Sequence, residues 1–228
     1  MNESCRTIYS KSTGEVIVKK SRFIASVFPI SSEEEALQLI EQVKKEHSGA
    51  RHNCFAYVAG KKDEIKRLSD DGEPAKTAGL PIMDLILIEK LHNILIVVTR
   101  YFGGTLLGTG GLVHAYQSAA KEGIQNALII EKEEAWKADI LIDYTLTGKI
   151  KYNIAQMGVY LLEEEYTDKV KLSLLIPPNA FEEFERSLLE ISAGTVKVPR
   201  DEILVYAIVN GNLEIFNERV SITPPCTI

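Results

Sequence analysis

Short apolar runs alternate with helical patterns along the first part of the chain. The segment from Glu15 to Ile30 is β-rich and follows a turn signal at Thr13-Gly14, and Arg51–Ala59 alternates as a strand does. Apolar residues recur at helical spacing after Ser31-Ser32 and after Thr77. Ile94–Val98 is a continuous β-branched run, which is typical of a buried strand.

The second part of the chain repeats this alternation in a different order. Trp136–Tyr144 has apolar residues at every second position, and a helical pattern then ends at Gly158. Strand patterns follow at Val159–Tyr166 and Val170–Ile176, and a further helix and later strands come after Asn179. The order βαββαβ fits a ferredoxin-like unit. A hairpin turn at Asn210-Gly211 predicts a further strand in the tail, Leu213 to Val220.

The charged cluster Glu131-Lys-Glu-Glu134 separates these two patterns. We expect two domains, 1–134 and 135–228, joined near this cluster. The whole chain has a net charge of −6, with −1 in the first domain and −5 in the second. This balance argues against a general nucleic-acid binder, whose domain is usually basic. A polyanion site is therefore expected as a local patch on the first domain.

The most unusual stretch is Thr99-Arg-Tyr-Phe-Gly-Gly-Thr-Leu-Leu-Gly-Thr-Gly-Gly111, which joins the buried strand to a helical pattern. Glycine lets another molecule approach the backbone, and the N-terminus of a helix offers free N–H donors to a phosphate or carboxylate. Arg100 adds a permanent charge. The stretch matches neither the dinucleotide fingerprint, because Val113 replaces the third glycine, nor a P-loop, because no lysine follows Gly108. A tight turn that serves packing alone is the alternative.

Two motifs give the chain a family resemblance. Val97–Leu112, together with Asp71-Gly-Glu-Pro-Ala-Lys-Thr-Ala-Gly-Leu-Pro81, closely resembles the IMPACT/YigZ family. The resemblance implies an α+β protein with an N-terminal α/β domain similar to the second domain of a small-subunit ribosomal protein. It also implies a ferredoxin-like C-terminal domain similar to a late domain of elongation factor G. Lys76 and His114 depart from the family pattern, in which we expect a small residue and an arginine.

The resemblance implies translation-linked regulation in eukaryotic members and nucleic-acid binding in bacterial ones. We therefore expect a non-catalytic module that binds RNA, a nucleotide or a translation component such as the ribosome. Arg100 is expected partly exposed at the mouth of a groove, with Lys76–Thr77 opposite; a buried Arg100 paired with Asp84 or Glu89 is the alternative. The predicted anion-binding residues are Arg51, His52, Lys76, Thr77, Arg100, Gly103, Gly104, Thr105, Gly108, Gly110 and Gly111.

An enzyme is the competing hypothesis. Asp70, Asp71 or Glu73 could act as acid or base on a phosphorylated or carboxylated small molecule, or could serve only the chemistry of a turn. No nucleophile elbow is present, so we assign no catalytic residue. The sequence does not decide whether the protein is an enzyme, but it favours a non-catalytic role. The spacing of His47, His52 and Cys54 matches no closed zinc site, and neither a metal nor a cofactor is expected.

Three cysteines without metal spacing fit reduced thiols in a cytosolic protein. No apolar run approaches ~18 residues, and the N-terminus lacks the pattern of a signal peptide. We therefore expect a cytoplasmic protein with no membrane partner.

Overall fold

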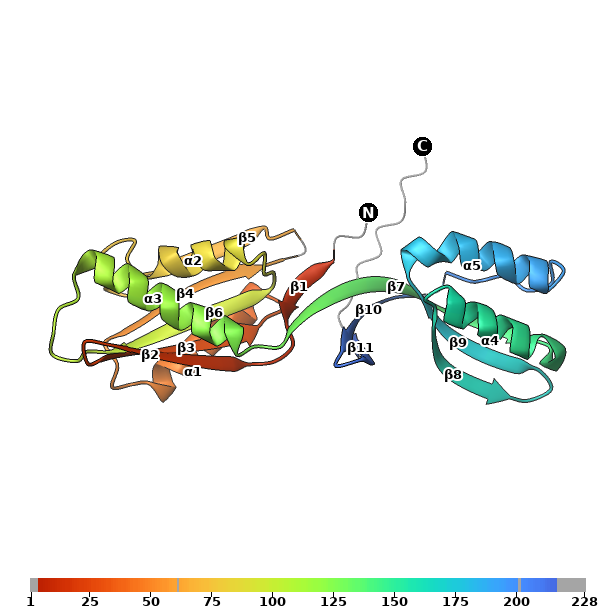
Figure 1. Cartoon of the computed structure of the whole chain (residues 1–228), viewed down its shortest axis with the longest axis horizontal. Coiled ribbons are helices and arrows are strands. Elements are labelled where there is room, and N and C mark those ends of the chain that lie inside the picture. The colour runs from red at the N-terminus through yellow and green to blue at the C-terminus, as the bar shows by residue number, and fades with distance from the viewer. Residues whose placement is uncertain (1–3, 61, 201, 217–228) are drawn as a thin grey trace, which may run out of the picture. The chain divides into compact units, whose positions relative to one another are not determined.

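The computed structural model describes residues 4–60, 62–200 and 202–216. Within them the chain is an α+β protein with five α-helices and two β-sheets (Figure 1). It divides into two compact units: one holds Cys5–Ile130, and the other holds Ser4 and the described residues from Glu131 onward. No helix among the described residues is both long and apolar enough to cross a lipid bilayer.

The N-terminal unit is built on a five-stranded antiparallel sheet in the order β2-β3-β6-β4-β5. Its strands are β2 (Ser12–Val18), β3 (Ser21–Pro29), β4 (His52–Ala59), β5 (Ile65–Ser69) and β6 (Ile94–Tyr101). A short strand, β1 (Cys5–Ile8), adds Ile8 to the core. The apolar run predicted as a buried strand is β6, which lies at the centre of the sheet and is buried from Ile94 to Arg100.

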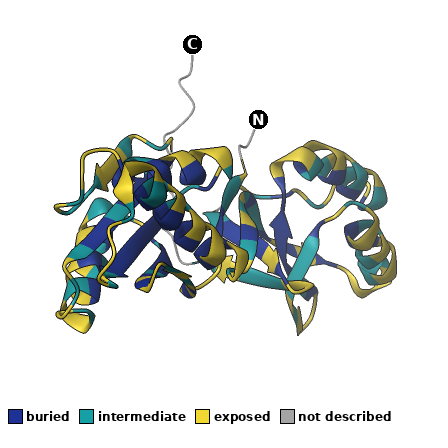
Figure 2. Cartoon of the chain, turned by 60° about the vertical axis from the view of Figure 1, so that its left-hand side comes forward, coloured by how far each residue is buried: buried dark blue, intermediate teal, exposed yellow. Residues whose placement is uncertain are grey.

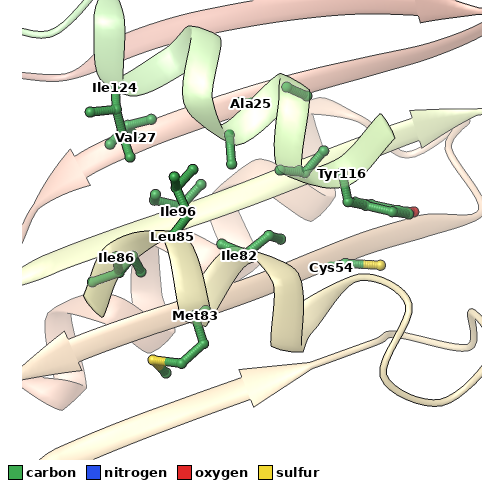
Figure 3. Packing of buried hydrophobic residues seen from close by; sticks show 14 of the residues in the cluster. Ala25, Val27, Cys54, Ile82, Met83, Leu85, Ile86, Ile96, Tyr116 and Ile124 are labelled. Atoms are coloured by element: carbon green, nitrogen blue, oxygen red, sulfur yellow. The ribbon is translucent and has the colours of Figure 1, made fainter. Parts of the chain in front are cut away.

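Helices cover both faces of this sheet, which explains why β6 is apolar at successive positions. Ile96 and Val98 pack beneath α2 (Gly79–Ile88) and α3 (Gly108–Gln125), as Figure 3 shows for Ile96. Leu95 and Val97 point to the other face and pack against α1 (Glu33–Glu46). Along α1 and α3 buried positions alternate with exposed ones, whereas most of α2 is buried (Figure 2).

Two glycines bring α3 close to the sheet. A Cβ on Gly14 of β2 would lie 2.3 Å from the amide nitrogen of Gly123, and a Cβ on Gly123 would lie 2.7 Å from Cγ2 of Val27. Gly14 was expected in a turn, but it lies inside β2 because α3 needs the space that a side chain would fill. The turn instead comes at Lys19 and Lys20, which both adopt left-handed conformations, with φ of 44° and 67°.

The second unit contains a sheet in which β11, β10, β7, β9 and β8 follow one another, all antiparallel. Helices α4 and α5 bury their apolar residues against β7 and β9 in one cluster that includes Phe184. The elements are β7 (Ile129–Ile142), a 3-10 turn (Tyr144–Leu146), α4 (Thr147–Gln156), β8 (Tyr160–Tyr166), β9 (Val170–Ile176), α5 (Pro178–Ile191), β10 (Glu202–Val209) and β11 (Asn212–Phe216).

Two features of this unit compare directly with the sequence patterns. The hairpin predicted at Asn210-Gly211 joins β10 to β11, and both turn residues have positive φ. Residues 217–220, the end of the predicted tail strand, lie outside the described residues. The charged cluster at Glu131–Glu134 belongs to a strand instead of a linker, because Glu133 and Glu134 pair with β10. A charged run can enter a sheet where its side chains keep access to water.

Candidate ligand-binding pocket

Arg100 lies near the end of β6, between one residue of each neighbouring strand. Its partners across the two ladders are Phe23 of β3 and His52 of β4. Cross-strand partners share a face of the sheet, so these three side chains lie on the face that α2 and α3 cover. The guanidinium carbon of Arg100 is 5.5 Å from the ring centroid of Phe23 and 5.6 Å from that of Phe102. Both distances suit a cation–π contact.

The charge of Arg100 is neutralised by Glu73. Arg100 Nη1 lies 2.6 Å from Glu73 Oε1, and the two side chains are 7% and 4% exposed. The hydroxyl of Tyr116 donates to the same oxygen at 2.9 Å. Burial raises the pKa of Tyr116, so its phenol stays a neutral donor.

This geometry corrects the expectation for Arg100. The side chain is buried instead of partly exposed, as in the alternative, but its partner is Glu73 and not Asp84 or Glu89. The physical reason is the cost of an unpaired buried charge, which a carboxylate in the same site removes. One donor of Arg100 remains unused: Nε is buried and has no hydrogen-bond partner in the described part of the chain.

A pocket of about 380 Å³ opens beside this ion pair, within the N-terminal unit. Its polar lining includes Arg51 and His52 at the start of β4 and the first residues of α3. Its apolar lining comes from α3 and from the loop between β6 and α3, which we call the glycine loop (residues 102–107). The lining residues are Arg51, His52, Glu73, Pro74, Arg100, Phe102, Leu106, Leu107, Gly108, Thr109 and Leu112.

The N-terminus of α3 has no side chain to cap it. Leu107 occupies the N-cap position without a capping hydrogen bond, and the first turn contains no acidic residue. Gly108, with φ of 73°, begins the helix, and Gly108 and Thr109 both line the pocket. The first N–H groups of a helix lack partners inside the helix and carry a partial positive charge. This end of α3 can therefore receive an anion.

The N-terminus of α2, the second predicted anion site, is already occupied. Asp70 Oδ1 accepts hydrogen bonds from the amides of Ala78 and Gly79 at 3.0 and 2.9 Å, and Oδ2 accepts one from Lys76 at 2.8 Å. Burial alone would raise the pKa of Asp70, but these backbone donors hold it below its ordinary value.

The prediction that Lys76 and Thr77 lie opposite Arg100 in an anion-binding groove is therefore wrong. Lys76 is exposed and Thr77 is buried, and neither lines the pocket. The donors at this helix end are satisfied by a carboxylate of the same chain, so they no longer attract an anionic ligand.

Asp71 and His52 attach the preceding loop to the sheet. Asp71 Oδ2 accepts from the amide of Asn53 at 2.6 Å, and Nδ1 of His52 lies 2.8 Å from the carbonyl oxygen of Asp71. A carbonyl can only accept, so Nδ1 donates, and in the neutral imidazole Nε2 is then the ring nitrogen that holds a lone pair. Asp71 itself has a left-handed φ of 41°, as the predicted turn chemistry requires.

The other predicted glycines have different surroundings. The amide of Gly103 donates to Ser21 Oγ at 3.1 Å, and a Cβ on Gly103 would lie 2.0 Å from the carbonyl carbon of Lys20. Gly103 thus serves close packing. Gly104 and Thr105 are exposed in the glycine loop, and Gly110 and Gly111 belong to the first turn of α3. Of the predicted set, Arg51, His52, Arg100 and Gly108 line the pocket.

Sequence patterns missed several residues of the site. Tyr116 was not predicted as a site residue, although its hydroxyl binds Glu73 while its ring packs in the core beside Cys54 (Figure 3). Phe102 and Leu106 were not singled out, yet both are large apolar residues within a glycine-rich loop, which was the available signal. Across residues 4–60, 62–200 and 202–216, no three His, Cys, Asp or Glu side chains gather in a way that could hold a metal ion.

Two family profiles match the chain. The Impact N-terminal domain matches residues 19–124, and a domain of unknown function (DUF1949) matches residues 140–195. The chain is 34% identical over 203 residues to IMPACT family member YvyE of Bacillus subtilis (strain 168), covering 89% of this chain and 94% of that one. It is 34% identical over 183 residues to IMPACT family member YigZ of Escherichia coli (strain K12), covering 79% and 90%. A crystal structure described as that of a hypothetical protein superposes with a TM-score of 0.57 at 32% identity and covers 88% of this chain and 98% of the other.

Proposed function

The chain belongs to the IMPACT family, and from this membership and the pocket we propose that it is a non-catalytic, translation-linked regulatory protein that binds RNA. The phosphate backbone of the RNA would lie at the N-terminus of α3. One observation carries the proposal: the uncapped end of this helix and the exposed Arg51 line the same pocket.

The charges around the pocket support an anionic ligand. Arg51 is exposed, so its charge is available to a partner, while the charge of Arg100 is balanced by Glu73. The helix end adds partial positive charge with backbone donors, an arrangement that suits phosphate. The acidic balance of the whole chain does not oppose this site, because screening limits the reach of exposed charges to about 8–10 Å at physiological salt.

The alternative enzyme function fits these contacts less well. Asp70 and Asp71 accept hydrogen bonds from backbone amides, which hold both carboxylates in structural roles. Glu73 lies in the pocket, but its Oε1 is bound by Arg100 and Tyr116 together. A general base must be able to accept a proton from the substrate. Glu73 would first have to leave an ion pair whose disruption costs several kcal/mol, roughly 3–5.

The finer fold assignments belong to the same proposal. We infer that the second unit is ferredoxin-like, supported by the antiparallel strand order β10-β7-β9-β8 and by α4 and α5 packing into one cluster with β7 and β9. For the first unit, the likeness to the second domain of a small-subunit ribosomal protein rests on the family resemblance. We place the domain boundary beside Glu131, where the two compact units divide.

Binding of labelled single-stranded RNA, followed by fluorescence anisotropy over a salt series, tests the proposed function. Affinity should fall steeply as salt rises, because each neutralised phosphate releases counterions. Arg51→Ala should weaken binding several-fold and make the salt slope shallower. Lys45→Ala is the matched control: it removes one exposed charge from α1, which covers the opposite face of the sheet, and should change nothing. Equal effects of the two substitutions would refute the site, and absence of RNA binding would refute the function.

A further inference from the structure

The apolar lining of the pocket includes two large side chains that remain exposed to solvent. Phe102 is 46% exposed and Leu106 is 83% exposed, and both line the pocket from the glycine loop. Single exposed apolar residues are common and need no explanation. These two line the same concave site as the more buried Leu107 and Leu112, so a ligand in the pocket can contact several apolar side chains.

The same pocket also offers donors beside these apolar residues. The uncapped N-terminus of α3 and the exposed Arg51 have been described above. Arg100 adds an independent observation, because this residue is 6% exposed, lines the pocket, and leaves its buried Nε without a hydrogen-bond partner among the described residues. A buried polar group without a partner is costly, so a residue of the pocket lining carries a donor that the described part of the chain leaves unsatisfied.

We propose that the pocket holds one nucleotide of single-stranded RNA, with its base against Phe102 and Leu106 and its phosphate at the N-terminus of α3 and Arg51. This inference rests on the proposed function and names the form of RNA that the pocket takes. A nucleotide joins a flat aromatic ring to a phosphate, which matches the apolar lining and the donors. Bases stack on aromatic side chains without regard to sequence.

The dimensions and chemistry of the pocket favour a single strand over a duplex. A volume of about 380 Å³ is near the lower end of the range for small-molecule sites, roughly 300–1,000 Å³. It suits one unstacked nucleotide, whereas paired bases remain stacked inside a helix. Recognition of RNA bases by stacking is generally directed at unpaired segments for this reason. His52 Nε2, with its lone pair, can accept a hydrogen bond from an exocyclic amine of the base or from a ribose hydroxyl.

The test compares four probes of similar length: single-stranded RNA, an abasic ribose-phosphate strand, an RNA duplex and inorganic polyphosphate. The wild-type protein should bind single-stranded RNA at least about ten-fold more tightly than the other three, the usual gain from one base stacked on an aromatic ring. Phe102→Ala should remove this preference while retaining affinity for polyphosphate. Phe102→Trp keeps an aromatic ring at this position and should retain the preference for single-stranded RNA. Leu106→Ala, at the more exposed position, should weaken RNA binding in the same direction.

Tyr152→Ala is the control, because Tyr152 is an aromatic residue on α4 of the other unit that is even more exposed, at 69%, and it should have no effect. Thermal unfolding of each variant identifies any loss of the folded state. If Arg51→Ala weakens RNA binding but Phe102→Ala does not, the base contact is refuted and the phosphate site stands. If neither RNA nor polyphosphate binds the wild-type protein, both proposals fail. Tighter binding of duplex RNA or of the abasic strand than of single-stranded RNA would also overturn this inference.

Discussion

Arg100 and Glu73 form an ion pair of 2.6 Å between side chains that are both almost completely buried. Arg100 belongs to the central strand β6, whereas Glu73 belongs to the loop between β5 and α2. The pair therefore attaches that loop to the sheet and sets one wall of the pocket. It also makes Arg100 a structural residue, whatever its contact with a ligand.

Loss of either partner should destabilise the protein strongly. Arg100→Ala or Glu73→Gln leaves the other group buried without its full partner, at a cost of about 3–5 kcal/mol. Loss of a partly exposed Arg100, as the sequence predicted it, would cost little stability, and the buried pair reverses this expectation. The measurement is the free energy of unfolding in urea.

Arg22→Ala is the control for this prediction. It breaks an ion pair with Glu15 whose side chains are 52% and 39% exposed, and stability should stay nearly unchanged. The double variant Arg100→Met/Glu73→Leu should be more stable than either single variant, since no charge is left alone. Simple addition of the two single losses would contradict the account of the pair.

Asp70→Ala should destabilise the protein by about 1–2 kcal/mol at neutral pH, because it removes the acceptor that caps α2. The pKa of Asp70 lies below its ordinary value in the folded state. Its stabilising effect is therefore complete above the ordinary aspartate value, about 3.9, and is lost as the pH falls through the lower folded value. Urea unfolding across acid pH should show the wild type and the variant converging.

Asp84→Ala is the control for the comparison of the wild type with Asp70→Ala across acid pH. Asp84 is exposed on the same helix, away from its first turn, and its loss should change stability little at any pH. A constant gap between wild type and Asp70→Ala down to strongly acid pH would show that the carboxylate charge of Asp70 does not stabilise the helix end.

Cys54 should resist alkylation in the folded protein. Burial raises the pKa of its thiol, and Sγ donates to the carbonyl oxygen of Asp70 at 3.0 Å. The reactive thiolate is therefore scarce, and the sulfur is inaccessible. Mass spectrometry after iodoacetamide treatment should show fast labelling of the partly exposed Cys5 and labelling of Cys54 only on unfolding. Equal rates at the two cysteines in the native protein would contradict this packing; Cys226 lies outside the described residues.

Gly14→Ala should destabilise the N-terminal unit by roughly 1–3 kcal/mol, the usual cost of overpacking. The added Cβ would lie 2.3 Å from the backbone nitrogen of Gly123, so strand and helix must separate. Gly148→Ala is the matched control, since nothing lies within 4 Å of that Cβ and the residue is in α4. Gly148→Ala should be neutral or stabilising by about 0.5–1 kcal/mol. Similar melting temperatures for the two variants would be inconsistent with the close contact.

Sequence patterns predicted what depends on local periodicity. The apolar run of β6, the helical pattern after Gly111 and the Asn210-Gly211 hairpin all follow from the spacing of a few neighbouring residues, although α3 begins earlier, at Gly108. The patterns failed where distant segments decide the outcome. Glu73 pairs with Arg100 across 27 positions, and the contact of Gly14 with α3 spans more than a hundred.

The same limit explains the errors in the candidate site. Glycines at Gly103 and Gly108 look alike in sequence, yet one packs on the β2–β3 turn and the other begins a helix at the pocket. The N-terminus of α2 looked free because its cap, Asp70, lies eight and nine positions before the amides that it receives. Which helix end stays open to a ligand depends on such contacts and not on composition.

The central claim is that RNA phosphate binds at the N-terminus of α3, and backbone amide NMR tests it most directly. Single-stranded RNA is titrated at low salt into isotopically labelled protein, and amide shift changes are mapped along the chain. We predict the largest changes at Gly108, Thr109 and Gly110 and at Arg51, reversed by added salt. If RNA shifts amides elsewhere and leaves the first turn of α3 unchanged, the claim is contradicted.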